Sequence, residues 1–538
     1  MARKAITLAV LLLALAPAAR LAWMAREMPH FGHLHDDSIY FVAAKSMAEG
    51  RGYRILSLPG EPFQTKYPPL WPLALAAIWR IDPRFPENLR WGMAVAWAML
   101  PAFMAVASYW FRSAGFGSSM RTSLCAVLVL SPWIAFMSTT LMSELVFSVA
   151  LLAALLAIEG AGTSVWHALA AGALSAVAYL IKTAALPLLI VGPLWLIWRR
   201  RHRSAVVFFC GMLPAVVAWM FWAGHHMTGA RDIVSLYYTN YLGYQIYNIA
   251  FRDLPLVMWK NLDGVFSGIA GLLIFDLGKS VFGMHLSRFL AIGAIVGVVR
   301  LARTHSVTPY HGFAAVYTAV LLVWHFPPNE RFMLPLFPLL LAGLESELAH
   351  LGSVMRGAWR QGAANRTVAA GIIACAATLA GFGIVMNAAA IFHEFPEIIG
   401  QHRTVVASNR AAFAWIAQHT DGGAFYAYDD PVFFLYTGHH AASLPVAPMP
   451  FYREDRAAIL APFRNMPAFA REQLLDYFLF TAADFHRDLP ESERREVRRI
   501  LSTQPEMIRI YDRELSAIYR LQPAGAGSPP LLTLASPR

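Results

Sequence analysis

Long apolar runs, separated by short polar or basic segments, fill most of residues 1–390. A helix needs about 20 predominantly apolar residues to cross the hydrocarbon core of a membrane, and many of the runs approach that length. The pattern therefore predicts about eleven transmembrane helices in this part of the chain. Their expected windows are 5–23, 89–111, 122–139, 142–159, 165–181, 183–198, 204–223, 284–301, 311–326, 331–348 and 367–391.

The first polar segment, 24–88, is too long to be a simple turn. It contains the apolar stretch 70–81, which is too short to cross a membrane. An amphipathic stretch of this length is typical of a helix lying in the membrane interface. We expect Trp71 and Trp79 to anchor it there, because tryptophan favours the boundary between lipid and water.

A second long segment, 224–283, carries a series of tyrosines and a further apolar stretch at 265–275. Counting this stretch as another span would break the alternation of charged loops described below. We therefore predict that it is re-entrant or interfacial.

The pattern changes after residue 391, where polar and apolar positions become mixed. Residues 410–419 have a helical pattern, and 424–428 and 477–480 are apolar and aromatic in the manner of buried strands. The segment 391–538 is therefore predicted to be a soluble α/β domain. Its end after Leu521 is rich in Pro, Gly and Ser, which is typical of a flexible tail.

Composition agrees with a polytopic membrane protein, since 57% of the residues are hydrophobic and only 14% are charged. The formal net charge is +11, but in a membrane protein such an excess reflects basic cytoplasmic loops rather than nucleic-acid binding. The three cysteines all lie in apolar runs, where sulfur packs as a small hydrophobe, and predict no disulfide framework. They are Cys125, Cys210 and Cys375.

The basic loops predict the orientation of the helices. If the N-terminal pair Arg3–Lys4 is cytoplasmic and the first helix is kept as an uncleaved span, alternation places every short basic loop on the same side, as positively charged loops prefer. The C-terminal domain and the segments 24–88 and 224–283 are then extracytoplasmic. The basic residues are Arg112, Arg121, Arg199, Arg200, Arg201, Arg203, Arg300, Arg303, Arg356, Arg360 and Arg366.

Several charged residues fall at the extracytoplasmic ends of the predicted spans, where burial of a charge is costly. They are Asp36, Asp37, Glu144, Lys182, Glu330 and Arg331. Each has an ordinary explanation: a solvated loop acid, a lysine reaching the interface, or local ion pairs such as Glu144 with Lys182 and Glu330 with Arg331. Their convergence on one face favours a functional site.

These residue types suit a particular chemistry. A carboxylate can accept the proton of an acceptor hydroxyl, and nearby cations can stabilise a phosphate as it leaves. Arginine binds phosphate through its planar guanidinium, and lysine binds it as a point charge. The face could thus displace a lipid phosphate from a reactive carbon while the lipid tail lies along the apolar helices.

Together these features resemble the GT-C superfamily of integral-membrane glycosyltransferases, in particular the branch of protein O-mannosyltransferases and lipid A aminoarabinose transferases. The layout of spans and C-terminal domain is similar, and about forty residues carry the motifs. The matching residues are Asp36-Asp37-Ser-Ile-Tyr40, Gly50-Arg-Gly-Tyr53, Tyr67-Pro-Pro-Leu-Trp-Pro72, Glu144, Gly172 through Pro187 with Lys182, and Glu330-Arg-Phe-Met-Leu-Pro335. The chain departs from the family pattern at Leu145, where relatives carry Pro, and at Lys182, where they carry Arg.

The resemblance implies a hexosyl or pentosyl transferase that moves a sugar, with inversion, from a polyprenyl-phosphate donor to a glycan, lipid or protein of the envelope. The location would be the bacterial inner membrane, with the site on the extracytoplasmic face. Asp36 is the first choice as base, with Asp37 as the alternative and Glu144 as a second acid. The expected substrate-binding residues are Tyr53, Lys66, Tyr67, Lys182, Glu330 and Arg331.

No cofactor is expected from the resemblance, although His33 and His35 beside the aspartates raise the possibility of a divalent metal, because His and Asp are ordinary zinc ligands. Solvated loop histidines are the simpler explanation. Two other functions are a transporter or flippase for lipid-linked sugars and a non-catalytic subunit of an envelope-assembly machine. A transporter would favour charges at mid-membrane and internal repeats, and the sequence shows neither pattern.

Overall fold

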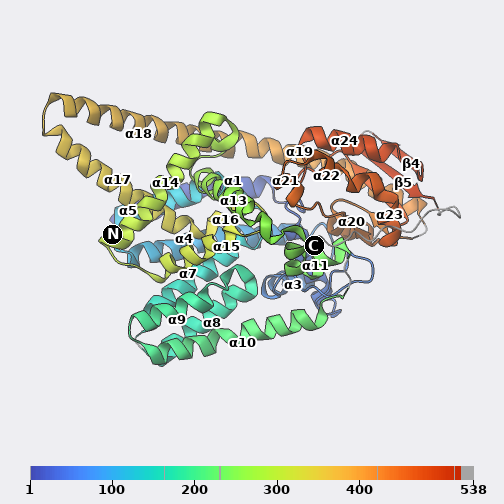
Figure 1. Ribbon diagram of the computed structural model, residues 1–538, viewed down its shortest axis with the longest axis horizontal. Coiled ribbons are helices and arrows are strands. Elements are labelled where there is room, and N and C mark those ends of the chain that lie inside the picture. The colour runs from blue at the N-terminus through green and yellow to red at the C-terminus, as the bar shows by residue number, and fades with distance from the viewer. Residues whose placement is uncertain (1, 163, 230–231, 421, 514, 523–538) are drawn as a thin grey trace.

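The computed structural model describes residues 2–162, 164–229, 232–420, 422–513 and 515–522. Figure 1 shows a large part made of helices and a smaller C-terminal part in which helices surround a short sheet. The long helix α19 (Phe395–His419) leads from the first part into the second. The predicted combination of a helical membrane part and a C-terminal α/β part is confirmed.

The helices of the first part follow one another through short connections. They are α1 (Ala2–Met24), α2 (Asp36–Ala48), α3 (Leu70–Ile81), α4 (Leu89–Ser113), α5 (Ser118–Leu130), α6 (Pro132–Met137), α7 (Glu144–Gly160), α8 (Val165–Ile181), η1 (Thr183–Ala185), α9 (Leu188–Trp198), α10 (His202–His226), α11 (Ile233–Thr239), α12 (Tyr241–Asn248), η2 (Phe251–Asp253), α13 (Leu254–Leu273), η3 (Leu277–Lys279), α14 (Val281–Thr304), α15 (Pro309–Leu322), α16 (Glu330–Met333), η4 (Leu334–Leu336), α17 (Phe337–Trp359), α18 (Ala363–Ala389) and η5 (Ala390–Glu394).

Every predicted transmembrane window coincides with one to three of these helices. Among the described residues, six helical segments are long and apolar enough to cross a membrane, which identifies an integral membrane protein. Other apolar helices, such as α8 and α9, are shorter, so the number of eleven spans stays a prediction. The six segments are Lys4–Met24, Leu89–Ser113, His202–His226, Val281–Thr304, Glu330–Trp359 and Ala363–His419.

The predicted window 122–139 is divided between α5 and α6. Pro132 lacks an amide hydrogen, and the residue before a proline disfavours the helical conformation, so α5 ends at Leu130. Ser131, in the gap, donates its hydroxyl to the carbonyl oxygen of Leu272 in α13 over 2.8 Å. The break is therefore joined to a neighbouring helix.

Helices α8 and α10 approach each other closely through glycines. A Cβ atom added to Gly172 of α8 would clash with the carbonyl oxygen of Phe208 in α10, and Gly211 faces the same contact from the other side. Without a hydrophobic force between helices in lipid, close backbone packing of this kind is a main source of their association. Lys182 directly follows the last residue of α8.

The stretch 70–81 forms the helix α3, and its position at the membrane interface stays a prediction. The proposed role of its tryptophans as interface anchors is wrong. Trp71 and Trp79 are buried, at 3% and 5% exposure. The indole of Trp71 donates to the carbonyl oxygen of Leu141, and that of Trp79 to the carbonyl oxygen of Phe41. Both indoles have a backbone acceptor inside the protein, so they hold α3 to the core instead of facing lipid.

The C-terminal sheet has five strands in the order β2-β1-β3-β5-β4. Strand β1 is parallel to β2 and β3, whereas β5 is antiparallel to β3 and β4. The strands predicted at 424–428 and 477–480 are confirmed, and the other three were not predicted. The elements are β1 (Phe425–Tyr426), α20 (Asp430–Thr437), β2 (Ala441–Ala442), α21 (Met449–Tyr452), α22 (Arg456–Leu460), η6 (Pro462–Asn465), α23 (Met466–Glu472), β3 (Tyr477–Thr481), α24 (Glu491–Ser502), β4 (Met507–Arg513) and β5 (Ser516–Leu521).

The predicted domain boundary near residue 391 lies inside a continuous helical segment, Ala363–His419, which includes α18, η5 and α19. The hairpin of α17 and α18 extends away from the other helices in Figure 1. The tail predicted after Leu521 falls almost entirely on 523–538, outside the described residues.

The C-terminal domain is also attached to the helical part through α21 and the residues after it. The Tyr452 hydroxyl donates to Asn261 Oδ1 of α13 over 2.7 Å. Arg453 pairs with Asp253, and Lys260 pairs with Glu454. The domain is thereby held beside the segments that carry the candidate site.

Candidate active site

Four charged side chains from separate helical segments meet in one cluster, which we call the carboxylate–cation cluster: Asp36, Glu144, Lys182 and Arg331. Arg331 Nη2 lies 3.0 Å from Asp36 Oδ2 and 2.9 Å from Glu144 Oε1. Lys182 Nζ lies 2.9 Å from the same Glu144 oxygen. Four of the six charged residues predicted on one face are therefore joined by direct contacts.

Helix ends position the cluster. Asp36 and Glu144 are the first residues of α2 and α7, where the positive end of the helix dipole favours a carboxylate. Lys182 directly follows the last residue of α8, where a cation is favoured. Arg331 lies in the short helix α16, whose N-terminus is capped by the side chain of Asn329.

Glu144 is the buried centre of the cluster, at 2% exposure. Its Oε1 accepts hydrogen bonds from Lys182 and Arg331, whereas Oε2 has no hydrogen-bond partner among the described residues. An unpartnered buried carboxylate oxygen is costly. The two cations on Oε1 offset part of this cost.

The two adjacent aspartates have different surroundings. The side chain of Asp36 is 23% exposed, and its Oδ1 accepts a 2.6 Å hydrogen bond from the Tyr67 hydroxyl. Asp37 is 1% exposed and accepts hydrogen bonds from the backbone amides of Gly32 and Ser38. Asp36 thus faces the cluster, and Asp37 holds the backbone before and after it.

Their pKa values diverge for the same reason. Burial alone would raise the pKa of Asp36, but the cations Arg331 and Lys66 outweigh it and lower that pKa below its usual value. Burial raises the pKa of Asp37 to about 7, and the neighbouring Asp36 charge adds to the rise. At neutral pH, Asp36 is ionised and available as a proton acceptor.

Lys66 lies beside the cluster inside an aromatic cage formed by Tyr67, Tyr237 and Tyr241. Its Nζ is 3.7 Å from the ring centroid of Tyr237, 4.5 Å from that of Tyr241 and 5.0 Å from that of Tyr67. Burial lowers the pKa of Lys66 to about 8, although the Asp36 charge opposes the shift. The electron-rich faces of the three rings stabilise the charge of the ammonium group. Its N–H donors stay available for an oxygen acceptor such as a phosphate.

The Tyr67 segment is held by the motif that precedes it. Tyr53 donates its hydroxyl to the carbonyl oxygens of Tyr67 and Pro68, at 2.9 and 3.3 Å. Gln64 Oε1 accepts from the backbone amides of Lys66 and Tyr67. Tyr53 was predicted to bind substrate, and the structure places its hydroxyl on the backbone that supports Lys66 and Tyr67.

Glu330 does not join the cluster, although its neighbour Arg331 does. Its carboxylate lies against α13, where a Cβ atom added to Gly271 would overlap it. The local pair of Glu330 with Arg331, considered from sequence, does not form either, since Arg331 pairs with Asp36 and Glu144.

The histidines beside the aspartates have separate partners. His33 Nδ1 is hydrogen-bonded to His402 Nε2 at 3.0 Å, and its ring stacks on that of His486. His35 Nε2 lies 3.0 Å from the Tyr238 hydroxyl. In the part of the chain that the structure describes, no group of His, Cys, Asp and Glu has a metal-binding arrangement.

Tyr237 and Tyr241 are not among the site residues predicted from the sequence. A signal was present, because tyrosines at 237, 241 and 244 recur at spacings of four and three, which place side chains on one face of a helix. The cage also depends on the turn at Asn240 between α11 and α12, which spacing alone does not predict.

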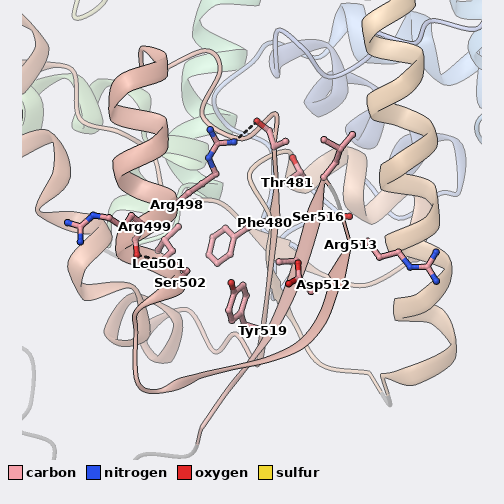
Figure 2. Close-up of a pocket in the computed structure, with 13 residues that line it drawn as sticks. Phe480, Thr481, Arg498, Arg499, Leu501, Ser502, Asp512, Arg513, Ser516 and Tyr519 are labelled. Carbon is pink, nitrogen blue, oxygen red and sulfur yellow. Dashed lines mark hydrogen bonds between the residues drawn. The ribbon is translucent and has the colours of Figure 1, made fainter.

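A separate hollow of about 350 Å³ lies in the C-terminal domain, between α24 and the strands β3 to β5. Figure 2 shows Phe480 and Tyr519 at its floor and Arg498 at its edge, where the guanidinium donates to the carbonyl oxygen of Ala482. Its described lining includes no residue of the carboxylate–cation cluster.

Comparison with solved structures shows that the chain has a GT-C-like fold. ArnT from Cupriavidus metallidurans bound to undecaprenyl phosphate aligns over 98% of this chain and 99% of its own, with a TM-score of 0.51 and 15% sequence identity. The archaeal oligosaccharyltransferase AglB from Archaeoglobus fulgidus, in complex with an inhibitory peptide and a dolichol-phosphate, aligns over 89% of this chain and 70% of its own. Its TM-score is 0.49 and its identity is 10%.

No family model matches the sequence, and no curated protein matches it. The likeness therefore lies in the fold, at identities too low to transfer an activity.

Proposed function

We propose that this protein is a glycosyltransferase that moves a sugar from a polyprenyl-phosphate donor to an acceptor in the cell envelope. The observation that carries the proposal is the contact of two carboxylates with two cations beside the caged Lys66. The fold shared with ArnT, which was solved with undecaprenyl phosphate bound, supports a lipid-phosphate ligand.

In the proposed reaction, a hydroxyl or amine of the acceptor attacks the anomeric carbon of the donor sugar. The bond between that carbon and the phosphate oxygen breaks, and polyprenyl phosphate leaves. The acceptor proton passes to Asp36, which is ionised and exposed to the site. Attack from the side opposite the phosphate inverts the anomeric carbon.

The cations have a matching role. Lys66 presents a positive charge that no described oxygen neutralises directly. Arg331 adds charge 3.0 Å from Asp36, and Lys182 adds charge beside Glu144. A leaving phosphate gains negative charge, so fixed cations around it stabilise the transition state. Tyr67 and Tyr53 maintain the geometry of Asp36 and Lys66.

Donor binding would also activate the base. Arg331 pairs with Asp36 in the ligand-free site, and a phosphate bound to Arg331 competes for the same guanidinium. Releasing Asp36 from that charge raises its pKa and makes it a stronger proton acceptor. Glu144, the second acid, would act on the acceptor from its position beside Lys182 and Arg331.

We further propose that the site and residues 391–538 are extracytoplasmic in a bacterial inner membrane, with residues 1–390 as the transmembrane core. The alternation of basic loops supports this orientation. A reporter fused after residue 400 should report an extracytoplasmic location, and a cytoplasmic signal would contradict it.

The test of function is transfer by the purified protein in liposomes that contain labelled polyprenyl-phosphate sugars and an envelope fraction. We expect release of polyprenyl phosphate and labelling of the acceptor, with Arg331→Gln as the inactive control. Mass analysis of envelope glycans with and without the protein then identifies the sugar. Movement of intact donor across the bilayer would indicate a transporter, and neither activity would indicate a non-catalytic subunit.

A further inference from the structure

The C-terminal domain contacts the segment Gly32–His35, which lies directly before Asp36. Arg487 Nη1 donates to the carbonyl oxygen of Gly32 over 3.0 Å. His486 Nε2 lies 3.2 Å from the carbonyl oxygen of His33. Helix α20 faces the helical part in Figure 1 and contacts α2. The backbone that leads into Asp36 is thus fixed by a domain remote in sequence.

A buried hydrogen-bonded chain forms the third contact. The Tyr238 hydroxyl donates to Asp430 Oδ1 over 2.5 Å, and it lies 3.0 Å from His35 Nε2. Because the hydroxyl has a single hydrogen, it accepts from His35 Nε2–H. Asp430 and Tyr238 are fully buried, and His35 is 6% exposed. The Asp430 carboxylate therefore sets the direction of both bonds.

His35 needs such a restraint because its backbone has a φ of 65°. A non-glycine residue in this region carries strain of about 1–3 kcal/mol, which the surroundings must offset. The strained residue immediately precedes Asp36, the first residue of α2. A change in the backbone of His35 would move the Asp36 carboxylate relative to Arg331 and Tyr67.

We propose that Asp430 is a positioning residue for Asp36 and acts on it through Tyr238 and His35. The inference rests on the proposed function, in which Asp36 accepts the acceptor proton. The C-terminal domain then takes part in the reaction, because it keeps the Asp36 carboxylate in position to accept the acceptor proton. A misplacement of about 1 Å can lower a rate about 100-fold.

Lys66 and Arg331 make no described contact with Asp430, so donor binding should not depend on this chain. Loss of Asp430 is therefore expected to lower kcat and leave the KM for donor unchanged. Tyr237 is adjacent to Tyr238 and packs on Lys66. If a variant of Asp430 or Tyr238 changed the KM for donor, the change would act through Tyr237 on Lys66 and not through Asp36.

The experiment compares Asp430→Ala, Asp430→Asn and Tyr238→Phe with a control, Val497→Ala, all in the full chain. Val497 is a fully buried apolar residue of α24, in the same domain. It reports what general damage to the domain does to transfer. Asparagine at 430 can still accept the Tyr238 hydrogen bond, whereas alanine cannot.

We expect Asp430→Ala and Tyr238→Phe to lower kcat about 10- to 100-fold at unchanged donor KM. Asp430→Asn should return kcat to within about threefold of the wild type, and Val497→Ala should keep kcat per folded molecule. Unchanged kcat, an altered donor KM, or an equal loss in Asp430→Ala and Val497→Ala would overturn the inference.

Hydrogen exchange at the amides of residues 32–38 separates this inference from the proposed function. Faster exchange in Tyr238→Phe supports the restraint, and unchanged exchange overturns it, whichever activity is found. Absence of sugar transfer by the wild type overturns the proposed function alone.

Discussion

Replacing Asp36 by asparagine removes one carboxylate charge and leaves the shape of the side chain almost unchanged. The asparagine oxygen can still accept from the Tyr67 hydroxyl, so the main loss is the 3.0 Å ion pair with Arg331. Arg331 keeps two hydrogen bonds to Glu144 Oε1 and remains paired. The lost charged contact costs about 1.5–3 kcal/mol at most, so we expect Asp36→Asn to fold and insert.

The effect on activity should be larger than the effect on stability. Loss of a general base lowers kcat about 10²- to 10⁴-fold, equivalent to about 2.7–5.4 kcal/mol in the activation barrier. Donor binding depends on the cations and should persist. The assay is single-turnover release of polyprenyl phosphate, run beside thermal unfolding of the same sample in detergent.

Asp37→Asn is the matched control at the adjacent position. The pKa of Asp37 is about 7, so the neutral asparagine resembles a form that is already populated at neutral pH. One of the two backbone amides of Gly32 and Ser38 loses its acceptor, which should cost about 1 kcal/mol in folding. We expect a lower melting temperature with at least about a tenth of wild-type kcat. If Asp37→Asn lost as much activity as Asp36→Asn, or Asp36→Asn stayed active, the assignment of the base would be refuted.

Three further predictions follow from the contacts of the site and of the helices. Donor affinity should weaken as pH rises above about 8, because Lys66 loses its charge above its lowered pKa; Lys66→Arg should abolish this decline in a donor-binding titration. Tyr67→Phe should lower kcat about 10-fold and move the acid limb of kcat/KM to higher pH, because the lost hydrogen bond stabilises the ionised form of Asp36. Gly172→Ala should destabilise the helical part by about 1–3 kcal/mol through its clash with Phe208, whereas Gly224→Ala, with open space around it, should not lower the melting temperature.

The helical segments could be predicted from sequence because the transfer of apolar residues into lipid is a local property of each run. Helix α4, Leu89–Ser113, includes the predicted window 89–111 for this reason. Which side of a helix is buried depends on its neighbours and not on its own residues alone. Trp71 and Trp79 of α3 are an example. Their amphipathic rings suit the membrane interface, yet backbone acceptors on Leu141 and Phe41 draw them into the core.

Some strands of the C-terminal sheet can likewise be recognised from their own residues, and others cannot. Strand β3 is an aromatic run that is recognisable from its own residues. Strand β2 has only two residues, and β4 exposes most of its side chains, so neither has a local signature. Their conformation is set by pairing with β1 and β5, which is a tertiary interaction.

For the site, the sequence by itself determined that charged residues lie at the ends of apolar segments, where each must have a partner or a role. The tertiary structure alone decided which ones meet, since Asp36 and Arg331 are 295 positions apart and Glu144 and Arg331 are 187 apart. Only the tertiary structure shows that Asp36 faces the cluster whereas Asp37 binds backbone amides. It also shows that Glu330 lies outside the cluster and that tyrosines surround Lys66. Spacing along a chain carries no record of such distant contacts, because packing of the helices and the docked domain creates them.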